Sequence, residues 1–328
     1  MAEESRTRII ILAGATGYIG LQVLCELIKR GYFVFCVGRN LADKKFSNYA
    51  GVQALDLELT SKNFDLDNLK KKIPKAYAVI SCIGSRKGGI KDSWNIEYFA
   101  NKNLLNFAQT IDCQQFILLS AICVQRPKLH FQQAKLAFEA ELMSSDITYS
   151  IVRPTAYFKS LAGQISNIKA GKPFILFDSG LNTACKPISK EDLAVFICNC
   201  LTLSEMRRKI IPIGGPGPAI TPIEQSKLLF SKAERPVKNK SIPSWIFLSL
   251  SYFLAPFSML SDKLADYREF LRIAYYYATE SMLVWDQEKN QYSDEDTPEY
   301  GKDKLGDFYE SIMKNKDESY SRVDTKLF

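Results

Sequence analysis

Histidine is almost absent from this chain: His130 is the only one among 328 residues. A single imidazole excludes metal sites built from several histidines, and it leaves one residue for any triad that needs an imidazole. The 8 cysteines form no CxxC pair, which argues against an iron–sulfur cluster. We therefore expect buried, reduced thiols, no disulfide framework and no metal site made by the protein.

The chain also lacks a strong excess of one charge, because 43 Lys+Arg stand against 36 Asp+Glu. A net charge of +7 is too diffuse to indicate a nucleic-acid partner, so none is expected. The first residues contain no apolar signal region. The uncharged stretch at 241–260 is interrupted by Pro243 and Pro256, which favours a packed helix, or contact with a membrane surface, over a membrane span.

Apolar, β-branched runs alternate with amphipathic segments through the first half of the chain. Strands are expected at 8–13, 32–37, 52–55, 76–83, 116–120 and 148–152, with helices at 18–30, 94–110 and 131–143. This alternation is typical of an α/β fold with a Rossmann-type doubly wound parallel sheet. We expect three parts: a Rossmann domain at 8–155, a smaller, mainly helical substrate subdomain at 156–286 with some segments returning to the first, and a polar C-terminal tail at 287–328.

A glycine-rich loop follows the first expected strand and opens the first helix, with the sequence GATGYIG at 14–20. Its first glycine permits the tight turn, the second lets the backbone approach a pyrophosphate, and the third allows close packing of the helix. The start of the helix adds amide donors and a partial positive charge for the phosphates. The cofactor contacts expected here are Gly14, Thr16, Gly17, Tyr18, Ile19 and Gly20.

The second strand leads into Arg39, at the place where an NAD site usually carries Asp or Glu for the ribose 2′-hydroxyl. A guanidinium can pair with a 2′-phosphate, which an acidic side chain would repel. The sequence therefore predicts NADPH as the cofactor rather than NADH. Further cofactor contacts are expected where other strands end: Asp56, Ser81, Cys82, Ser85 and Pro154.

The helix at 131–143 begins FQQAK, where short-chain reductases carry Tyr-x-x-x-Lys, so Lys135 is present and the tyrosine is not. We expect Lys135 to hold the nicotinamide ribose, with Ser120 and Cys123 beside it in the catalytic site. Without a strong positioned acid, the site suits a substrate whose charge is delocalised, such as an alkene conjugated to a large π-system. The proton donor is open among three residues: His130, Cys123 and Tyr157.

Several longer blocks carry a resemblance to one family. They are SRKGGIKDSW at 85–94, LSAICVQ at 119–125, YSIVRPTA at 149–156, TACKPIS at 183–189, PIGGP at 212–216 and YYYATESM at 275–282. Over about residues 8–310, the chain resembles the NADPH-dependent divinyl chlorophyllide 8-vinyl reductases, which are atypical, NmrA-like short-chain dehydrogenases/reductases. The resemblance implies reduction of the 8-vinyl group of a divinyl (proto)chlorophyllide or divinyl chlorophyll to ethyl by NADPH, in chlorophyll biosynthesis. It also implies that phenylalanine in place of the tyrosine is usual.

A flat tetrapyrrole, which brings its own magnesium, needs an apolar slot with stacking aromatics and a cation for its propionate. The substrate contacts expected are Tyr157, Phe158, Lys159, Lys186, Trp245 and Tyr276. The resemblance further implies a bacterial cytoplasm or a plastid stroma. Membrane attachment stays open, and the apolar 242–260 stretch would suit a peripheral contact with a photosynthetic membrane. Three alternatives are another NADPH-dependent reductase of a conjugated alkene, a non-catalytic NADP(H) sensor and a pigment carrier.

Overall fold

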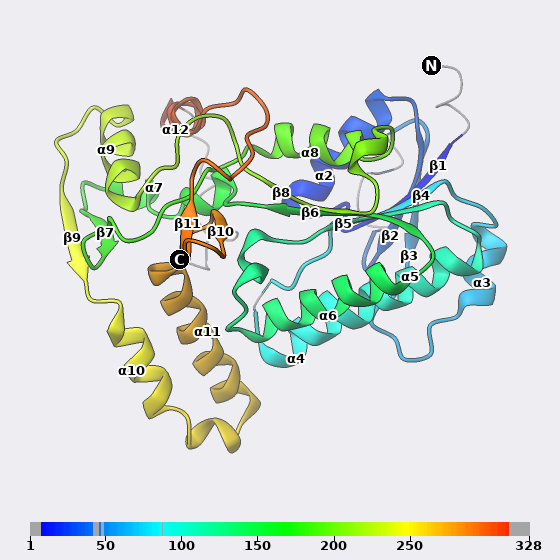
Figure 1. Cartoon of the computed structure of the whole chain (residues 1–328), viewed down its shortest axis with the longest axis horizontal. Coiled ribbons are helices and arrows are strands. Elements are labelled where there is room, and N and C mark those ends of the chain that lie inside the picture. Colours follow the sequence, from blue (N-terminus) through cyan, green and yellow to red (C-terminus); the bar gives the residue numbers. More distant parts are fainter. Residues whose placement is uncertain (1–7, 42–45, 47–48, 87, 315–328) are drawn as a thin grey trace.

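A sheet of parallel strands lies at the centre of the molecule (Figure 1). The computed structural model describes residues 8–41, 46, 49–86 and 88–314. The sheet has 7 strands in the order β3-β2-β1-β4-β5-β6-β8, and all of its neighbours pair in parallel. The strands are β1 (Ile9–Ala13), β2 (Phe33–Gly38), β3 (Val52–Asp56), β4 (Ala78–Ser81), β5 (Gln115–Leu119), β6 (Thr148–Pro154) and β8 (Lys209–Ile213). The predicted Rossmann-type sheet is confirmed, and its strand order reverses between β1 and β4, where such sheets bind dinucleotides.

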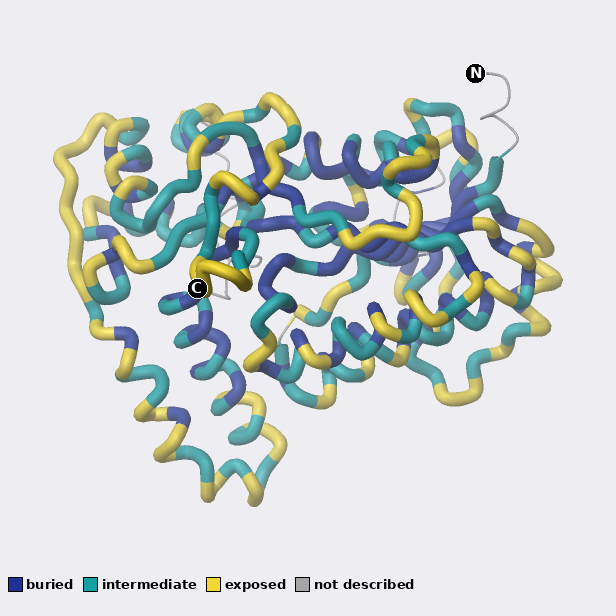
Figure 2. The backbone as a smooth tube through the Cα atoms, viewed as in Figure 1, coloured by how far each residue is buried: buried dark blue, intermediate teal, exposed yellow. Residues whose placement is uncertain are grey.

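Helices cover both faces of this sheet, so its inner strands are buried (Figures 1 and 2). On one face, α2 (Tyr18–Lys29) packs against α8 (Lys190–Asn199). The other face is covered by α3 (Leu66–Lys72), α5 (Ala100–Thr110) and α6 (His130–Ser144). A strand that is buried on both faces has no polar side, which is why these strands read as continuous apolar runs in the sequence.

The segment after β6 is built from short elements and a second, two-stranded parallel sheet. The elements are η4 (Phe158–Leu161), α7 (Ile165–Lys169), β7 (Phe174–Phe177), η5 (Ser204–Met206), α9 (Pro222–Lys232) and β9 (Asn239–Ile242). Strand β7 pairs with β9, while β8 returns to the main sheet beside β6. The chain therefore crosses back and forth between the two sheets.

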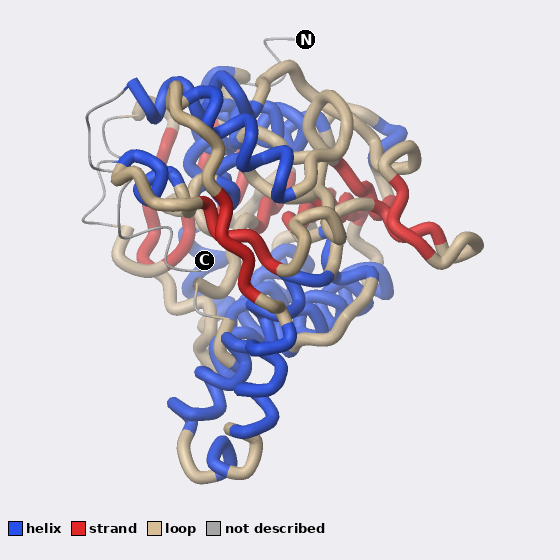
Figure 3. Tube along the Cα trace, turned by 90° about the vertical axis from the view of Figure 1, so that its left-hand side faces the viewer, coloured by secondary structure: helices blue, strands red, loops and turns tan. Residues whose placement is uncertain are grey.

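A helical hairpin projects from the body of the molecule (Figures 1 and 3). It consists of α10 (Trp245–Phe253), the single turn η6 (Phe257–Met259) and α11 (Asp262–Thr279). The chain reverses between the two helices near Pro256, which lacks the backbone N–H that a continuous helix needs. In the described residues, no helix is both long and apolar enough to cross a membrane.

The expectation of a polar tail from residue 287 is wrong for the described part of that segment. Strand β11 (Gln291–Ser293) pairs antiparallel with β10 (Val284–Asp286), and α12 (Leu305–Lys314) follows. Helix α12 buries Tyr309 completely against Phe230 and its neighbours in the core below α9. Charged residues surround the three buried positions of this helix, so its composition resembles that of a polar tail. The spacing of the buried positions, however, is that of an amphipathic helix.

Candidate cofactor-binding and active site

The glycine-rich loop connects β1 to α2 at the switch point of the sheet. Gly14 has a φ of +84°, which L side chains rarely adopt, and a Cβ there would lie 2.6 Å from the carbonyl oxygen of Cys82. Gly17 is the N-cap residue of α2 and has no side chain with which to cap it. The first amides of α2 are thus oriented to receive phosphate oxygens. Thr16 is exposed in the turn, while Ile19 is buried beneath it.

The first prediction concerns Gly20, whose backbone lies against the glycine-rich loop. A Cβ at this position would be 2.0 Å from the carbonyl oxygen of Gly14, so alanine would push α2 away from the loop. We expect Gly20→Ala to lower the free energy of unfolding by about 3 kcal/mol and to weaken dinucleotide binding. Urea unfolding and a fluorescence titration with NADPH would measure the two effects.

The matched control is Gly306→Ala in α12, where the added methyl would make ordinary 3.5 Å contacts with the side chains of Leu228 and Lys232. Alanine has the higher helix propensity, so this variant should be as stable as the parent or slightly more stable. Equal losses in the two variants would contradict the close contact at Gly20.

Arg39 follows β2 directly and its side chain is exposed. Its guanidinium lies 3.9 Å from the carboxylate of Glu58, and such exposed pairs contribute little free energy. Asp56, at the end of β3, accepts the backbone N–H of Leu41 at 2.5 Å. Asp56, which was expected to contact the cofactor, therefore anchors the turn that carries Arg39. A phosphate dianion could compete with Glu58 for the guanidinium.

The end of β4 lies beside the glycine-rich loop. Ser81 is fully buried, and its hydroxyl donates to Oδ1 of Asn101 at 2.6 Å, so its side chain supports the strand end. Burial raises the pKa of the neighbouring Cys82 thiol to about 12, which keeps it protonated at neutral pH. Farther along, the backbone N–H of Ser85 donates to Oε1 of Glu97 at 2.8 Å.

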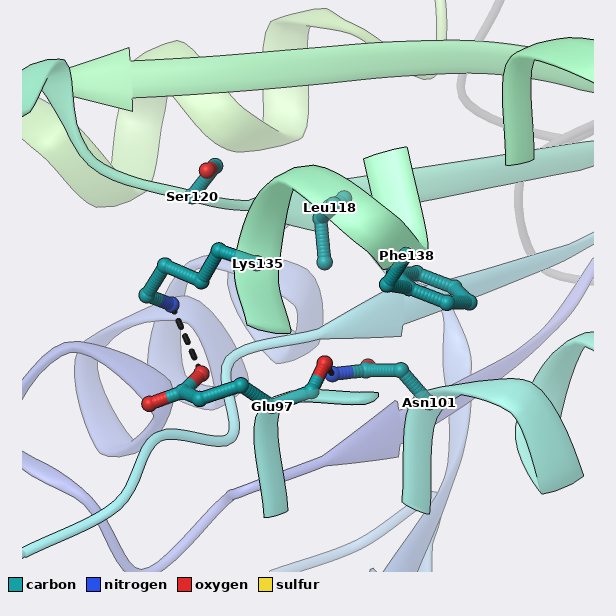
Figure 4. A pocket seen from close by; sticks show the side chains of 6 residues that line it. All are labelled: Glu97, Asn101, Leu118, Ser120, Lys135 and Phe138. Atoms are coloured by element: carbon teal, nitrogen blue, oxygen red, sulfur yellow. Dashed lines mark hydrogen bonds and ion pairs between the residues drawn. The ribbon is translucent and has the colours of Figure 1, made fainter. Parts of the chain in front are cut away.

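Lys135 and Glu97 form the centre of the site, and Figure 4 shows their side chains pointing toward one another. Nζ of Lys135, on α6, lies 2.8 Å from Oε2 of Glu97, whose side chain is only 3% exposed. Together with Asn101, Leu118, Ser120 and Phe138, they line a small pocket. The lysine is therefore held in place beside the ends of β4 and β5 by a buried carboxylate.

Glu97 is a site residue that the sequence analysis missed. It lies in η2 (Trp94–Phe99), a π-helical stretch between α4 (Ile90–Ser93) and α5. The expected helix at 94–110 is present, but it begins with wider, π-type turns. Such turns are frequent at functional sites. One signal was available: Glu97 stands four residues before Asn101, so both polar groups share one face of the helix.

Ser120 belongs to a second buried network next to the pocket. Its hydroxyl donates to Oε1 of Glu139 at 2.5 Å, and Nε of Arg153 donates to the same oxygen at 3.1 Å. Glu139 lies one helical turn after Lys135 and is 1% exposed. Arg153 neutralises Glu139, and Lys135 is left to pair with Glu97.

Protonated thiol and phenol groups gather near this pocket. The hydroxyl of Tyr276 donates to the carbonyl oxygen of Cys123 at 3.0 Å, and Tyr277 hydrogen-bonds the thiol of Cys123. Burial raises the pKa of Cys123, Tyr157 and Tyr277, so each of them keeps its proton at neutral pH. These groups can donate a proton but are poor nucleophiles. His130 lies at the start of α6, where its backbone N–H donates to Glu269 at 2.9 Å.

Some of the expected substrate residues lie close to the glycine-rich loop. The ring of Tyr157 is 6.4 Å from that of Tyr18, and the ammonium groups of Lys159 and Lys190 lie 5.2 and 5.7 Å from the centre of the Tyr18 ring. Pro154 ends β6 on the same edge of the sheet. The start of α2 is consequently lined by aromatic rings and positive charge.

The other expected substrate residues lie elsewhere. Phe158 is buried in the core formed with α9 and α12. Lys186 is also buried, and its ammonium pairs with Asp294 at 2.9 Å and Glu299 at 2.8 Å. Trp245 is 61% exposed at the start of α10. None of these three side chains lines the pocket around Lys135.

Comparisons with known proteins agree with a dinucleotide site. The NAD(P)H-binding family matches residues 14–203. The chloroplastic divinyl chlorophyllide a 8-vinyl-reductase of Arabidopsis thaliana is 43% identical over 323 residues, 93% of this chain and 76% of the relative. That of Zea mays is 42% identical over 318 residues, 93% of this chain and 79% of the relative.

A solved structure shows the same fold at low identity. The NADPH-dependent quinone oxidoreductase of Escherichia coli, in complex with NADPH, superposes with a TM-score of 0.66 at 15% identity. The match covers 92% of this chain and 99% of that one. The sheet, the loop and the helices on both faces are therefore those of a nicotinamide-dinucleotide fold.

Proposed function

The chain belongs to the divinyl chlorophyllide a 8-vinyl-reductase family, and from this membership we propose that it reduces the 8-vinyl group of a divinyl chlorophyllide-type tetrapyrrole to ethyl in chlorophyll biosynthesis. One observation carries the proposal: the identity of 43% extends over 93% of the chain. The glycine-rich loop and the pocket around Lys135 supply the matching chemistry.

NADPH is proposed as the cofactor, and when bound it supplies a hydride. The amides at the start of α2 would hold its pyrophosphate, Arg39 its 2′-phosphate and Lys135 its nicotinamide ribose. The exposed Arg39 supports NADPH, since it stands at the position after β2 where an NAD site usually carries an acidic residue.

The vinyl group gains one hydride and one proton in this reaction. Hydride addition at its terminal carbon leaves negative charge spread over the macrocycle, so no localised oxyanion requires a strong partner. A weak acid is then sufficient to supply the proton that completes the reduction. We propose Tyr157 or Cys123 as that acid, because burial keeps both groups protonated near the end of β5 and the Lys135 pocket.

We propose that residues 8–155 supply the cofactor side of the site and that 156–286 supply the pigment side. Tyr157, Lys159 and Tyr276 would face the tetrapyrrole, since they adjoin Tyr18 or Cys123. We propose that the reaction takes place in a plastid stroma, which the chloroplastic relatives support, or in a bacterial cytoplasm, with peripheral contact to a photosynthetic membrane.

An absorbance assay tests the proposed function. Purified protein is mixed with divinyl chlorophyllide and NADPH, with NADH in parallel, and the pigment is analysed by mass spectrometry. We expect a blue shift of the Soret band and an ethyl product with NADPH. Cofactor binding without turnover would favour a sensor or another conjugated alkene as substrate, and pigment binding without NADPH consumption would favour a carrier; either result would overturn the proposal.

A further inference from the structure

An exposed apolar surface covers the hairpin formed by α10, η6 and α11. Eight of the 15 large apolar side chains that are exposed in the described part of the chain lie there: Trp245, Leu250, Tyr252, Phe253, Phe257, Met259, Leu260 and Tyr267. Met259 and Leu260, at the turn, are 89% and 81% exposed. Single apolar side chains are common on protein surfaces, but so many of them on one hairpin mark an interaction site.

The hairpin can enter a surface without disturbing the sheet, because it projects from the body (Figures 1 and 3). Helix α11 has 18 residues and therefore extends about 27 Å at 1.5 Å per residue. Its far end carries Tyr276, which donates to Cys123 in the site. One helix thus connects the apolar tip to the proposed pigment side.

The charge pattern indicates what the tip contacts. No charged residue occurs from 241 to 261, which includes the whole turn of the hairpin. Charged residues begin on either side of this stretch. Lys238 and Lys240 are exposed on or next to β9. At the start of α11, Asp262 pairs with Lys91 at 2.6 Å, and Lys263 beside it is exposed. An apolar tip flanked by cations matches hydrocarbon below and anionic headgroups above, and the rings of Trp245 and Tyr252 suit the boundary between them.

We propose that this hairpin inserts its tip into one leaflet of a lipid bilayer that contains anionic lipid, and so holds the pigment site at the membrane surface. The inference deepens the proposed function, because a hydrophobic tetrapyrrole dissolves in the same bilayer. Lipid binding by the hairpin does not depend on turnover, so the two proposals can fail separately.

Vesicle binding by the full chain tests the inference. Vesicles of phosphatidylcholine with phosphatidylglycerol, and of phosphatidylcholine alone, are titrated with protein and recovered by flotation. We expect binding to the anionic vesicles with a blue shift of the tryptophan emission, to which the exposed Trp245 contributes, and weaker binding to the neutral ones. The triple variant Phe253→Ser/Met259→Ser/Leu260→Ser should bind about 100-fold more weakly, because it loses most of the inserted apolar area.

The matched control is Leu181→Ser/Val237→Ser, which removes exposed apolar side chains outside the hairpin. It should bind vesicles like the parent. Unchanged binding of the triple variant would overturn the inference. So would a dimer in lipid-free ultracentrifugation that the triple variant abolishes, since a second copy would then cover the tip.

An activity measurement separates this inference from the proposed function. With divinyl chlorophyllide in detergent, the triple variant should reduce the pigment as fast as the parent, because its substitutions lie at the tip, away from Lys135. A parent protein that binds vesicles but reduces no pigment contradicts only the proposed function. A parent protein that reduces pigment but ignores vesicles contradicts only the hairpin inference.

Discussion

Lys135→Met is expected to lower kcat/KM for NADPH-dependent reduction by about 1,000-fold. Nζ of Lys135 is fixed 2.8 Å from Glu97 in the pocket at the ends of the central strands. The ammonium is therefore held where the nicotinamide ribose would lie, and its loss removes both a positioning contact and a positive charge. Steady-state kinetics with varied NADPH, together with the Kd for NADPH, would measure the effect.

The same variant should also be less stable. Removal of the ammonium leaves the carboxylate of Glu97 buried without its charge partner, which costs about 3–5 kcal/mol. The double variant Lys135→Met/Glu97→Gln removes both charges and should recover most of the free energy of unfolding. It should not recover activity, and a double variant with normal kcat/KM would disprove the role given to Lys135.

Lys102→Met on α5 is the matched control. Lys102 also pairs with a carboxylate, Glu141 at 2.9 Å, but both of these side chains are partly exposed to solvent. Exposed pairs of this kind contribute at most about 1 kcal/mol. We expect this variant to keep the activity and nearly all the stability of the parent, so that losses specific to Lys135 come from its site.

The central sheet could be predicted from the sequence because its signals are local. Each buried parallel strand is a short apolar run, and the loop that starts at Gly14 shows a spacing that few other structures require. Arg39 directly follows the end of β2, and Ser120 directly follows the end of β5. The positions of both residues therefore follow from the strand boundaries. The structure therefore has these residues at strand ends, as the sequence predicts, while their roles in the site stay predictions.

Contacts between distant segments could not be predicted in this way. Lys186 looked like a cation for a substrate carboxylate, but Asp294 and Glu299 occupy it, and both belong to the segment expected to be a tail. Glu97, which pairs with Lys135, lies in a π-helical stretch, and a helical periodicity does not reveal such turns. In both cases a buried charged side chain pairs with a residue far along the chain. Such a pairing depends on tertiary packing rather than on a local sequence pattern.

Arg39→Asp is expected to reverse the cofactor preference, with the ratio of kcat/KM for NADPH to that for NADH falling by about 1,000-fold. A charged hydrogen bond contributes about 1.5–3 kcal/mol, and the substituted carboxylate adds repulsion toward the 2′-phosphate, so a total of about 4 kcal/mol is reasonable. Each 1.4 kcal/mol corresponds to about a tenfold change. Kinetics with both cofactors at low and at moderate salt would measure this ratio. In the parent, the preference for NADPH should be stronger at low salt, because salt screens the attraction between Arg39 and the 2′-phosphate.

Arg207→Asp is the control for this charge reversal. Arg207 is exposed after η5, so the substitution changes the net charge of the protein by the same amount away from the turn that Asp56 anchors. Its cofactor ratio should match that of the parent, which would separate a local contact from the overall electrostatic field. If Arg39→Asp weakened NADPH and NADH equally, the guanidinium would be supporting the turn rather than reading the 2′-phosphate, and the choice of NADPH would lose its structural basis.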